Sequence, residues 1–346
     1  MKVLGIISSL TEASARTRVL QFTDPLKKEN INLTGKYYLP LRYSEPAAWA
    51  NRLGKFTGIS PWRYLHLHKT INRLPLLITQ FQYDIIWQNR LIMPHHSFLE
   101  RSLLKPVVFD FDDAIWIVDK EKPVIRGIEK AEIVFAGNDY LAEYAIKYNK
   151  NTVVVPTVID TTALYPLKKE TDHFTIGWIG TNTNFKYLEI VKPAITKFLS
   201  LHKEARFFVV SSEPPPQFNF DNNKYIFRKW DATQENEMIN MFSIGIMPIE
   251  DSDFTKGKCS YKMLQYMACG KPVVVSPAGT NKKILHETEA GIAANSTAEW
   301  FDAFSILKTD FSFSQKCAEN GRKLVESKYS VIVSTPIIAG NFKKIV

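Results

Sequence analysis

The sequence is poor in cysteine and has no long hydrophobic run. Three cysteines occur in 346 residues, at positions 259, 269 and 317. Their odd number and wide spacing exclude a disulfide framework and a zinc-ligand pattern, and they favour a reducing compartment. The most apolar stretches are short or interrupted, at residues 74–78, 85–87 and 331–338. None approaches the roughly 20 apolar residues that a membrane-spanning helix requires.

A secretory leader is not expected either. The opening MKVLGIISSL has a short apolar run that Ser8 and Ser9 interrupt, and no small-residue cleavage site follows it. We therefore expect a first β-strand here and a cytoplasmic protein. The hydrophobic content of 45% and charged content of 23% are typical of a globular protein. A chain of this length suits two α/β domains of similar size.

Charge of one sign is concentrated early in the chain. Residues 36–106 hold ten Lys or Arg, three acidic residues and eleven aromatic residues, within a chain of net charge +9. Such a surface can bind anionic lipid headgroups, and the protein would then be peripheral on the inner face of the plasma membrane. It can also receive a phosphorylated acceptor. The alternative is ordinary scatter of cations over solvated faces with the aromatics in the core. Single-stranded nucleic acid is a weaker candidate, because no RNA-binding signature is present, and we expect no nucleic-acid partner.

Strand and helix signals alternate along the whole chain, which predicts parallel sheets with crossover helices. The expected strands are residues 3–8, 32–38, 84–88, 107–112, 133–136, 153–156, 175–179, 205–211, 225–227, 244–247 and 272–276. The polar, proline-containing stretch 161–172 marks the boundary between the two halves.

The most informative segment is KGKCSYKMLQYMACGKPVVVSPAG, residues 256–279. It predicts a helix from about Cys259 that ends at Gly270, followed by a buried strand. Lys258, Lys262 and Gln265 have helical spacing on the side opposite the apolar residues. A helix N-terminus with two lysines can hold a diphosphate, whereas the simpler interpretation is a solvated polar face.

This segment resembles the donor-binding signature of retaining GT-B glycosyltransferases of family four. The resemblance extends in order to SARTRVLQF (14–22), VVVPTVIDTTALYP (153–166), IGWIGTNTNFKYL (176–188) and GRKLVESKYS (321–330). It implies an α/β fold of two Rossmann-like domains with parallel sheets that face an interdomain cleft. Residues 1–163 would form the acceptor-side domain, with 330–346 packing back onto it, and residues 164–329 would bind the nucleotide-sugar donor.

The turn at residues 177–186 is the expected diphosphate site. Gly177 and Gly180 allow close backbone approach, although the third glycine of a dinucleotide fingerprint is missing, and the N–H groups from Thr181 to Asn184 can meet a phosphate. The family has an Arg after the second glycine, where Thr181 stands here, and a Lys that Lys186 matches. The resemblance therefore makes Lys186 the leading cation, with Lys258 or Lys262 replacing the lost charge.

Other family positions are altered. Gln265 stands in place of the glutamate that binds the donor ribose, and an amide is the weaker acceptor. The first family glutamate falls on Gly257, so Asp251 and Asp253 are candidate substitutes unless they form a solvated acidic loop. Arg228 and Trp230 stand where the family meets the nucleobase. The full set of donor-binding candidates is Gly180, Thr181, Asn182, Asn184, Lys186, Arg228, Trp230, Lys258, Ser260, Tyr261, Lys262 and Gln265.

Acidic residues follow the expected strand 107–112. Asp112 and Asp113 take the place of a family His-Asp pair near the transferred sugar, so the catalytic candidates are Asp112, Asp113 and Lys186. Carboxylates at this end of a parallel strand lie where α/β ligands bind, although one of them can simply cap the next helix. Asp110 and Asp112 also resemble the nucleophile loop of haloacid-dehalogenase-type phosphatases, with Gly137-Asn-Asp139 as an acidic metal loop. That alternative leaves residues 170–346 unexplained.

The sequence therefore predicts an enzyme that moves a sugar from a nucleoside-diphosphate sugar to a hydroxyl of a glycan or lipid-linked acceptor, with retention, in surface polysaccharide or glycolipid synthesis. In the mechanism that the resemblance implies, a donor phosphate oxygen takes the acceptor proton. No metal or other cofactor is expected, because helix N-termini and lysines can stabilise the leaving diphosphate. The altered family positions leave a non-catalytic nucleotide-sugar or glycan-binding protein as the second interpretation.

Overall fold

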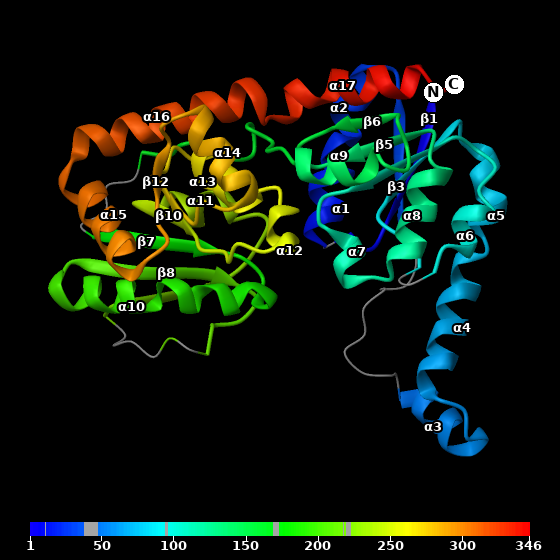
Figure 1. Ribbon diagram of the computed structural model, residues 1–346, viewed down its shortest axis with the longest axis horizontal. Helices are drawn as coiled ribbons and strands as arrows, with labels where there is room; N and C mark the ends of the chain where they lie inside the picture. The colour runs from blue at the N-terminus through cyan, green and yellow to red at the C-terminus, as the bar shows by residue number, and fades with distance from the viewer. Residues whose placement is uncertain (11, 38–47, 94–95, 169–172, 217, 219–222) are drawn as a thin grey trace. The chain divides into compact units, whose positions relative to one another are not determined.

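The computed structural model describes residues 1–10, 12–37, 48–93, 96–168, 173–216, 218 and 223–346. The chain folds into two compact units (Figure 1). Unit 1 comprises Met1–Pro156 with Thr335–Val346, and unit 2 comprises Thr157–Ser334. Within the described residues, no helix is long and apolar enough to cross a bilayer.

Unit 1 contains a six-stranded parallel sheet in the order β2-β1-β3-β4-β5-β6. Its strands are β1 (Lys2–Ile7), β2 (Asn32–Tyr37), β3 (Ile85–Asn89), β4 (Val107–Phe111), β5 (Ile133–Ala136) and β6 (Thr152–Val154). Every residue of β3, β4 and β5 is buried, as expected for parallel strands covered on both faces.

The helices of unit 1 follow the strands in the expected alternation. They are α1 (Ala13–Arg18), η1 (Leu20–Phe22), α2 (Thr23–Lys28), α3 (Ala48–Thr57), α4 (Pro61–Arg73), α5 (Leu76–Thr79), η2 (Gln80–Gln82), α6 (Phe98–Arg101), α7 (Ile115–Val118), α8 (Glu121–Lys130) and α9 (Asp139–Ala145).

Unit 2 contains a second six-stranded parallel sheet, in the order β12-β11-β10-β7-β8-β9. Its strands are β7 (Phe174–Ile179), β8 (Ala205–Ser211), β9 (Tyr225–Lys229), β10 (Ile244–Met247), β11 (Val273–Val275) and β12 (Gly291–Ala293). The sequence patterns did not predict β12, because it is short, only partly buried and opens with a glycine. A side chain at Gly291 would meet the carbonyl of Val273 on the neighbouring strand.

The helices of unit 2 pack on both faces of this sheet, around two apolar clusters. They are η3 (Asn182–Asn184), α10 (Phe185–Leu201), α11 (Glu235–Asn240), α12 (Asp253–Lys256), α13 (Tyr261–Ala268), α14 (Gly279–Glu287), α15 (Thr297–Thr309) and α16 (Phe311–Lys328). All three cysteines are buried, and none forms a disulfide within the described residues.

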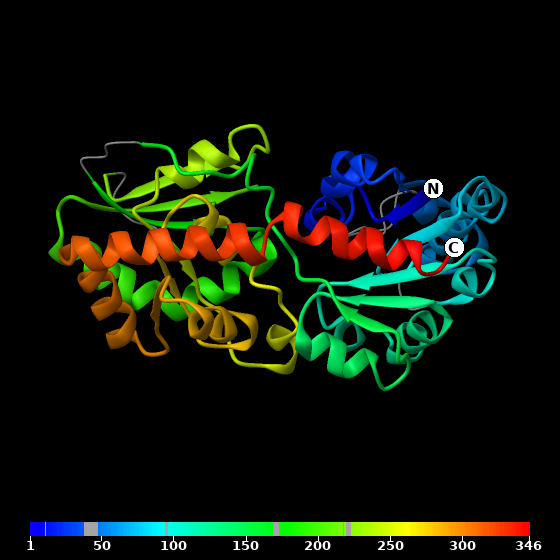
Figure 2. The same ribbon diagram turned by 90° about the horizontal axis from the view of Figure 1, so that it is seen from above.

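The last helix, α17 (Val331–Lys343), starts in unit 2 and ends in unit 1. It is drawn in red in Figure 2. Near its end the Phe342 ring packs 5.4 Å from Trp87 and 6.0 Å from Phe135, centroid to centroid. Because all three side chains are buried, this short C-terminal segment completes the core of unit 1.

Candidate functional site

The strand order of each sheet locates a candidate ligand site. In unit 2 the chain proceeds from β7 through β8 to β9 on one side, and through β10, β11 and β12 on the other. The switch point lies between β7 and β10, where ligands of open α/β sheets bind at the carboxyl ends of the strands. The segments that leave these ends are residues 180–186 and 248–262, which contain most of the donor-site candidates.

Helix α13 is held over this switch point by Tyr266. Its hydroxyl accepts a hydrogen bond from the Ile179 N–H at 3.1 Å and donates one to the Ile246 carbonyl at 3.2 Å. Residue 245 must be glycine for this packing, since a β-carbon there would lie 2.2 Å from the Tyr266 ring. The phenol therefore ties α13 to the ends of both β7 and β10, and burial raises its pKa above the ordinary value.

The turn after β7 offers backbone donors. The Gly180 N–H donates to the Val210 carbonyl, and the Asn184 N–H donates to the Thr181 carbonyl at 3.0 Å. Asn184 is therefore not an open backbone donor, in contrast to the sequence-based expectation. Within the described residues, the N–H groups of Thr181, Asn182 and Thr183 form no hydrogen bond. Three consecutive N–H groups at the start of a helix provide an anion-binding arrangement.

The three candidate lysines converge on this turn. The Nζ atoms of Lys186 and Lys258 lie 4.8 Å and 6.0 Å from the centroid of the same ring, that of Tyr187. Lys262 lies with its Nζ 5.7 Å from the Trp178 ring, and its Cε would be 2.6 Å from a β-carbon at Gly180. The structure thus brings together cations from two separate sequence motifs at one end of the sheet. We name Gly180, Lys186, Lys258 and Lys262 the lysine cluster.

An acidic residue that the sequence analysis missed belongs to the same region. The Glu250 Oε1 atom lies 3.7 Å from Lys186 Nζ, and both side chains are more than half exposed. The proposed substitutes are placed differently: Asp251 is exposed, and Asp253 pairs with Lys256 at 3.0 Å in the first turn of α12. Glu250 follows β10, the direct neighbour of β7, and this strand adjacency is the signal that would have identified it.

The start of α13 differs from the prediction. Ser260 has φ of 54°, in the left-handed region, so the helix starts at Tyr261 and Lys258 precedes it. The Ser260 hydroxyl is buried and donates to Asn281 Oδ1 at 2.6 Å, which gives it a structural partner. Tyr261 is partly buried against the core of unit 2.

Gln265, on the expected polar face of α13, is buried, with a relative exposure of 3%. Its side-chain amide forms no hydrogen bond within the described part of the chain. This face of the helix is therefore not a solvated surface.

The remaining donor-site candidates lie on β9, directly after β9, and in the turn after β7. Arg228 is exposed on β9, the edge strand. The Trp230 Nε1–H donates to Glu235 Oε1 at 2.8 Å, and its ring packs against the core. Asn182 donates to Glu213 Oε1 at 2.8 Å, across the turn.

In unit 1 the carboxyl end of β4 carries a fully buried ion pair. The Asp110 Oδ1 atom accepts from Arg18 at 2.9 Å, and its Oδ2 accepts from the Trp87 Nε1–H at 2.9 Å. Burial raises the pKa of Asp110 to about 6, against the opposing effect of Arg18. Both carboxylate oxygens are engaged and neither reaches solvent, so Asp110 cannot act as the nucleophile of a phosphatase.

The other feature of the phosphatase alternative is also structural. Asn138 caps α9, where its side chain accepts from the Leu141 N–H. Among the residues that the structure describes, no group of three His, Cys, Asp or Glu is arranged to hold a metal ion. The haloacid-dehalogenase resemblance is therefore a local sequence likeness without the corresponding site.

Asp112 and Asp113 form an ionic cluster with Arg90, which the sequence analysis missed. Arg90 Nη2 lies 2.8 Å from Asp112 Oδ1 and 2.6 Å from Asp113 Oδ2, while Ser14 donates to Asp112 at 2.8 Å. Burial alone raises the pKa of Asp112, but Arg90 and Arg18 lower it to below the ordinary value. Neither aspartate caps α7 through its side chain, since Ala114 is the N-cap residue.

Arg90 itself has an unusual backbone. Its φ is 62°, a conformation that non-glycine residues rarely adopt. It follows β3, the strand beside the switch point between β1 and β3 in unit 1. Strained residues of this kind concentrate at functional sites. Asp112 and Asp113 remain partly exposed, at 13% and 26% for their side chains.

Comparison with solved structures identifies the fold. Sucrose-phosphate synthase from Thermosynechococcus elongatus superposes with a TM-score of 0.71 at 12% identity, covering 99% of this chain and 98% of that one. HepE from Anabaena, solved with UDP and glucose, gives 0.68 at 14% identity, with 99% of both chains covered. A glycosyltransferase from Rickettsia africae gives 0.66 at 12% identity, covering 99% and 98%. No curated protein sequence matches the chain.

Two parallel six-stranded α/β units with this strand order define a protein of the GT-B class. Residues 173–310 match the family model described as Glycosyl transferases group 1, and they include β7, β10, α13 and the lysine cluster. The match lies within unit 2, and this part of the chain is therefore similar to the glycosyl transferases group 1 family.

Proposed function

We propose that the protein transfers a sugar from a nucleoside-diphosphate sugar, bound by unit 2, to a hydroxyl group of an acceptor. The observation that carries this proposal is the lysine cluster beside the turn after β7. Lys186 and Lys258 share the ring of Tyr187, and Lys262 lies against Gly180. The family model that residues 173–310 match, described as Glycosyl transferases group 1, supports the same activity, and HepE was solved with UDP and glucose.

The chemistry follows from the charge of the leaving group. When the glycosidic bond of the donor breaks, negative charge grows on the diphosphate. The three open N–H groups at Thr181, Asn182 and Thr183 and the three lysine ammonium groups stabilise that charge without reorganisation of water. Glu250, paired with Lys186, is a candidate partner for the donor-sugar hydroxyls in place of the glutamate lost at Gly257. Gln265 is retained as the candidate for the ribose.

Three finer points belong to this proposal. Transfer proceeds with retention of configuration, and a donor phosphate oxygen takes the acceptor proton, so no protein base is needed. No metal ion is required, because the lysine cluster supplies the positive charge. The acceptor is a glycan or a lipid-linked glycan that binds unit 1 near Asp112 and Asp113, and the protein works on the cytoplasmic side of the membrane in surface polysaccharide or glycolipid synthesis.

The test begins with a thermal-shift screen over nucleoside diphosphates and their sugars, since a ligand that binds only the folded form raises the melting temperature. Lys186→Ala should abolish most of the shift. Lys192→Ala is the matched control, because Lys192 lies on the same helix and pairs only with Glu189 at 3.9 Å. Equal shifts in both variants would remove Lys186 from the donor site. Proton NMR of the product anomer then distinguishes retention from inversion.

A second candidate function is nucleotide-sugar or glycan binding without turnover. The observation that favours it is the pair of altered family positions, Thr181 in place of Arg and Gly257 in place of Glu. Gly257 ends the short helix α12 and presents no side chain. Release of free sugar from a bound donor, measured over hours with purified protein, would eliminate this candidate. Binding without any release would support it.

A further inference from the structure

A continuous segment of unit 1 lacks acidic residues altogether. Residues 48–83, which form α3, α4, α5 and η2, contain no Asp or Glu. Three cations in this segment, Arg52, Lys55 and Arg63, are exposed. In a chain with 35 acidic residues, this segment has Lys and Arg side chains but no Asp or Glu, so its formal charge is of one sign.

The same segment exposes a stripe of large apolar side chains. The stripe runs along α4, α5 and η2 at alternating spacings of four and three residues, and consists of Leu67, Ile71, Leu74, Ile78 and Phe81, with exposures of 57%, 52%, 43%, 76% and 58%. On α3 the same periodicity exposes Trp49, Leu53 and Phe56, the last to 90%. Within each helical segment these residues lie on one side, because three and four residues correspond to about one turn. We name this set the apolar stripe.

Packing fixes the helices that carry the stripe. Thr57 and Tyr64 join α3 to α4 through their hydroxyl groups at 2.6 Å, and the Trp49 ring lies 5.2 Å from that of His68. Within unit 1, Figure 1 shows α3 at the end of α4 that lies away from the sheet. The apolar stripe is therefore presented by ordered helices.

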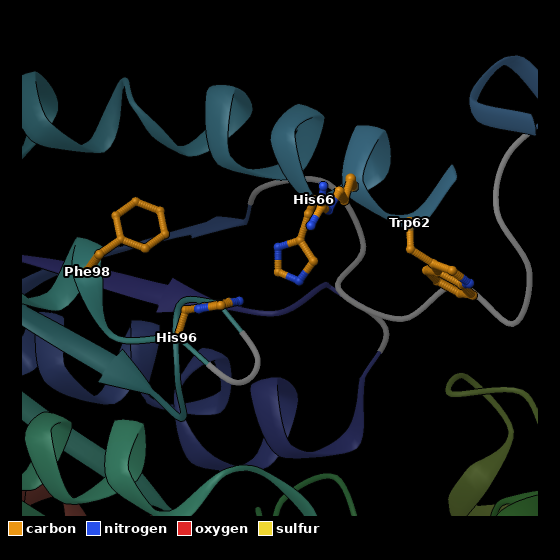
Figure 3. A pocket seen from close by; sticks show the side chains of 5 residues that line it. Trp62, His66, His96 and Phe98 are labelled. Atoms are coloured by element: carbon orange, nitrogen blue, oxygen red, sulfur yellow. The ribbon is translucent and has the colours of Figure 1, made fainter. Parts of the chain in front are cut away.

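A pocket of about 520 Å³ lies beside α4 and is lined by Trp62, Arg63, His66, His96 and Phe98 (Figure 3). The His66 and His96 rings meet edge to face, 4.9 Å apart. The described residues of its lining offer nitrogen donors and aromatic faces and no carboxylate. Such a lining suits a phosphate group next to an apolar phase.

These observations select among possible occupants of the face. A large exposed apolar patch marks an interaction site. Symmetric pairing of this face with a second copy of the chain would bring two cationic surfaces together, which like-charge repulsion opposes. An anionic phospholipid surface matches both features of the face. Its acyl boundary can bury the apolar side chains, and its phosphates can pair with the cations.

We propose that the face formed by α3, α4, α5 and η2 docks on the surface of an anionic bilayer. The apolar stripe enters the acyl boundary, and Arg52, Lys55 and Arg63 contact headgroup phosphates. Docking of this kind would bring unit 1 to an acceptor held in the membrane. Its biological purpose rests on the proposed function, in which the acceptor is a lipid-linked glycan.

The experiment is co-sedimentation of the full chain with vesicles of phosphatidylcholine alone or mixed with phosphatidylglycerol, at low and high salt. We expect binding only to the anionic vesicles, with loss at high salt because the screening length shortens. Arg52→Gln, Lys55→Gln and Arg63→Gln should each lower the partition coefficient by roughly a factor of five. Lys203→Gln, Lys282→Gln and Lys323→Gln, at exposed positions of unit 2, are the charge-matched controls.

A second variant tests the apolar contribution without disturbing the core. The triple change Leu67→Gln, Ile71→Gln and Ile78→Gln should abolish sedimentation. Its matched control changes three exposed apolar residues of unit 2, Leu201→Gln, Ile306→Gln and Phe311→Gln, and should sediment like the wild type. Brominated lipids should quench Trp49 and Trp62, which are 40% and 46% exposed.

Three outcomes would overturn the proposal: recovery of the wild type in the supernatant under all conditions, equal binding by the stripe variant and its control, or a lipid-free dimer in ultracentrifugation that the stripe variant dissolves. Donor binding by unit 2 is measured on the same preparations by thermal shift. If vesicle binding is absent while nucleotide binding persists, docking alone is wrong. If Lys186→Ala binds vesicles normally and the wild type binds no nucleotide, the proposed function alone is wrong.

Discussion

Lys262 lies so close to Gly180 that a β-carbon at position 180 would come within 2.6 Å of the Lys262 Cε atom and 2.7 Å of the Trp178 ring. The turn after β7 and the start of α13 are thereby in contact. The glycine leaves room for the side-chain stem of Lys262 beside the turn.

Gly180→Ala should therefore weaken donor binding. The new methyl group must displace either Lys262 or the buried Trp178, and overpacking of this kind costs about 1–3 kcal/mol of stability. Isothermal titration with a nucleoside diphosphate measures the loss of affinity. Gly340→Ala is the control, since no atom lies within 4 Å of a β-carbon there and the residue is helical. If the two variants bind the nucleotide equally well, the Lys262 contact does not matter for the donor.

Lys258→Ala should lower the affinity for a nucleoside diphosphate by about 1.5–3 kcal/mol, the usual contribution of a charge-assisted hydrogen bond. Lys256→Ala should leave it unchanged, because Lys256 pairs with Asp253 on α12. The comparison is made by titration at several salt concentrations. A similar loss in both variants would indicate a diffuse charge effect and contradict a specific role for Lys258.

Asp112→Asn should destabilise unit 1, because it removes one of the charges that neutralise Arg90. Breaking a well-buried pair costs about 3–5 kcal/mol, and partial exposure of this cluster reduces the expected loss to about 1–3 kcal/mol. The lowered pKa of Asp112 means that its stabilising contribution is present above the unfolded-state pKa and is lost as pH falls through the folded-state pKa. Urea unfolding between pH 3 and 7, values chosen to bracket about 3.9, measures both effects.

Turnover of the same Asp112→Asn protein, assayed where it is fully folded, tests the catalytic assignment. A purely structural aspartate predicts unchanged turnover per folded molecule. A contact with the substrate predicts a fall in kcat that stabilising solutes do not restore.

Glu100 should make the protein less stable as pH rises. Burial raises its pKa to about 7 from an ordinary 4.5, against the hydrogen bonds from Ile92 and Gln88, and its Oε2 atom has no partner within the described residues. The contribution of Glu100 to the free energy of unfolding is complete below pH 4.5, and it is lost as pH rises through the folded-state pKa of about 7. Glu100→Gln should remove about 3 kcal/mol of the change in the free energy of unfolding with pH.

Chemical unfolding at pH 5 and pH 8, on either side of a pKa of about 7, follows the effect. Glu132→Gln, at an exposed position, serves as the control and should preserve the slope. A slope that persists in Glu100→Gln would show that another group causes it.

Sugar transfer should survive chelation. With positive charge supplied by the lysine cluster, EDTA should leave the initial rate within about twofold, whereas metal-dependent catalysis commonly loses several kcal/mol of transition-state stabilisation. Rates with and without EDTA, and after addition of Mg²⁺ or Mn²⁺, decide the question. A rate that collapses with EDTA and recovers with one cation would contradict the metal-free proposal.

The sequence predicted the parts of the fold that depend on local patterns. Buried parallel strands are continuous apolar runs, so β4 and β10 were located almost to the residue. The three-residue β12 has no such run. The start of α13 was missed because Ser260, a residue without a glycine's freedom, adopts a left-handed conformation under tertiary constraint.

The candidate site was predictable where chemistry follows a motif and not where it depends on distant pairing. Lys186 was proposed from the turn that precedes it, and the structure places it and Lys258 at the same Tyr187 ring. The Arg18–Asp110 bond joins residues 92 positions apart, and only the β1-β3-β4 order brings them together. The sequence around Arg90 did not predict its ion pairs, because a single Arg after an apolar strand can have many different partners.

The return of α17 to unit 1 has a consequence for synthesis. Unit 2 is continuous from Thr157 to Ser334, so it can fold on the ribosome as soon as it emerges. Unit 1 is made first and yet is finished last, since the pocket around Trp87 and Phe135 stays open until Phe342 has been translated. Until then a nascent chain exposes aromatic surface, and a nonsense mutation between Ser334 and Phe342 would release a completed unit 2 attached to an unfinished unit 1.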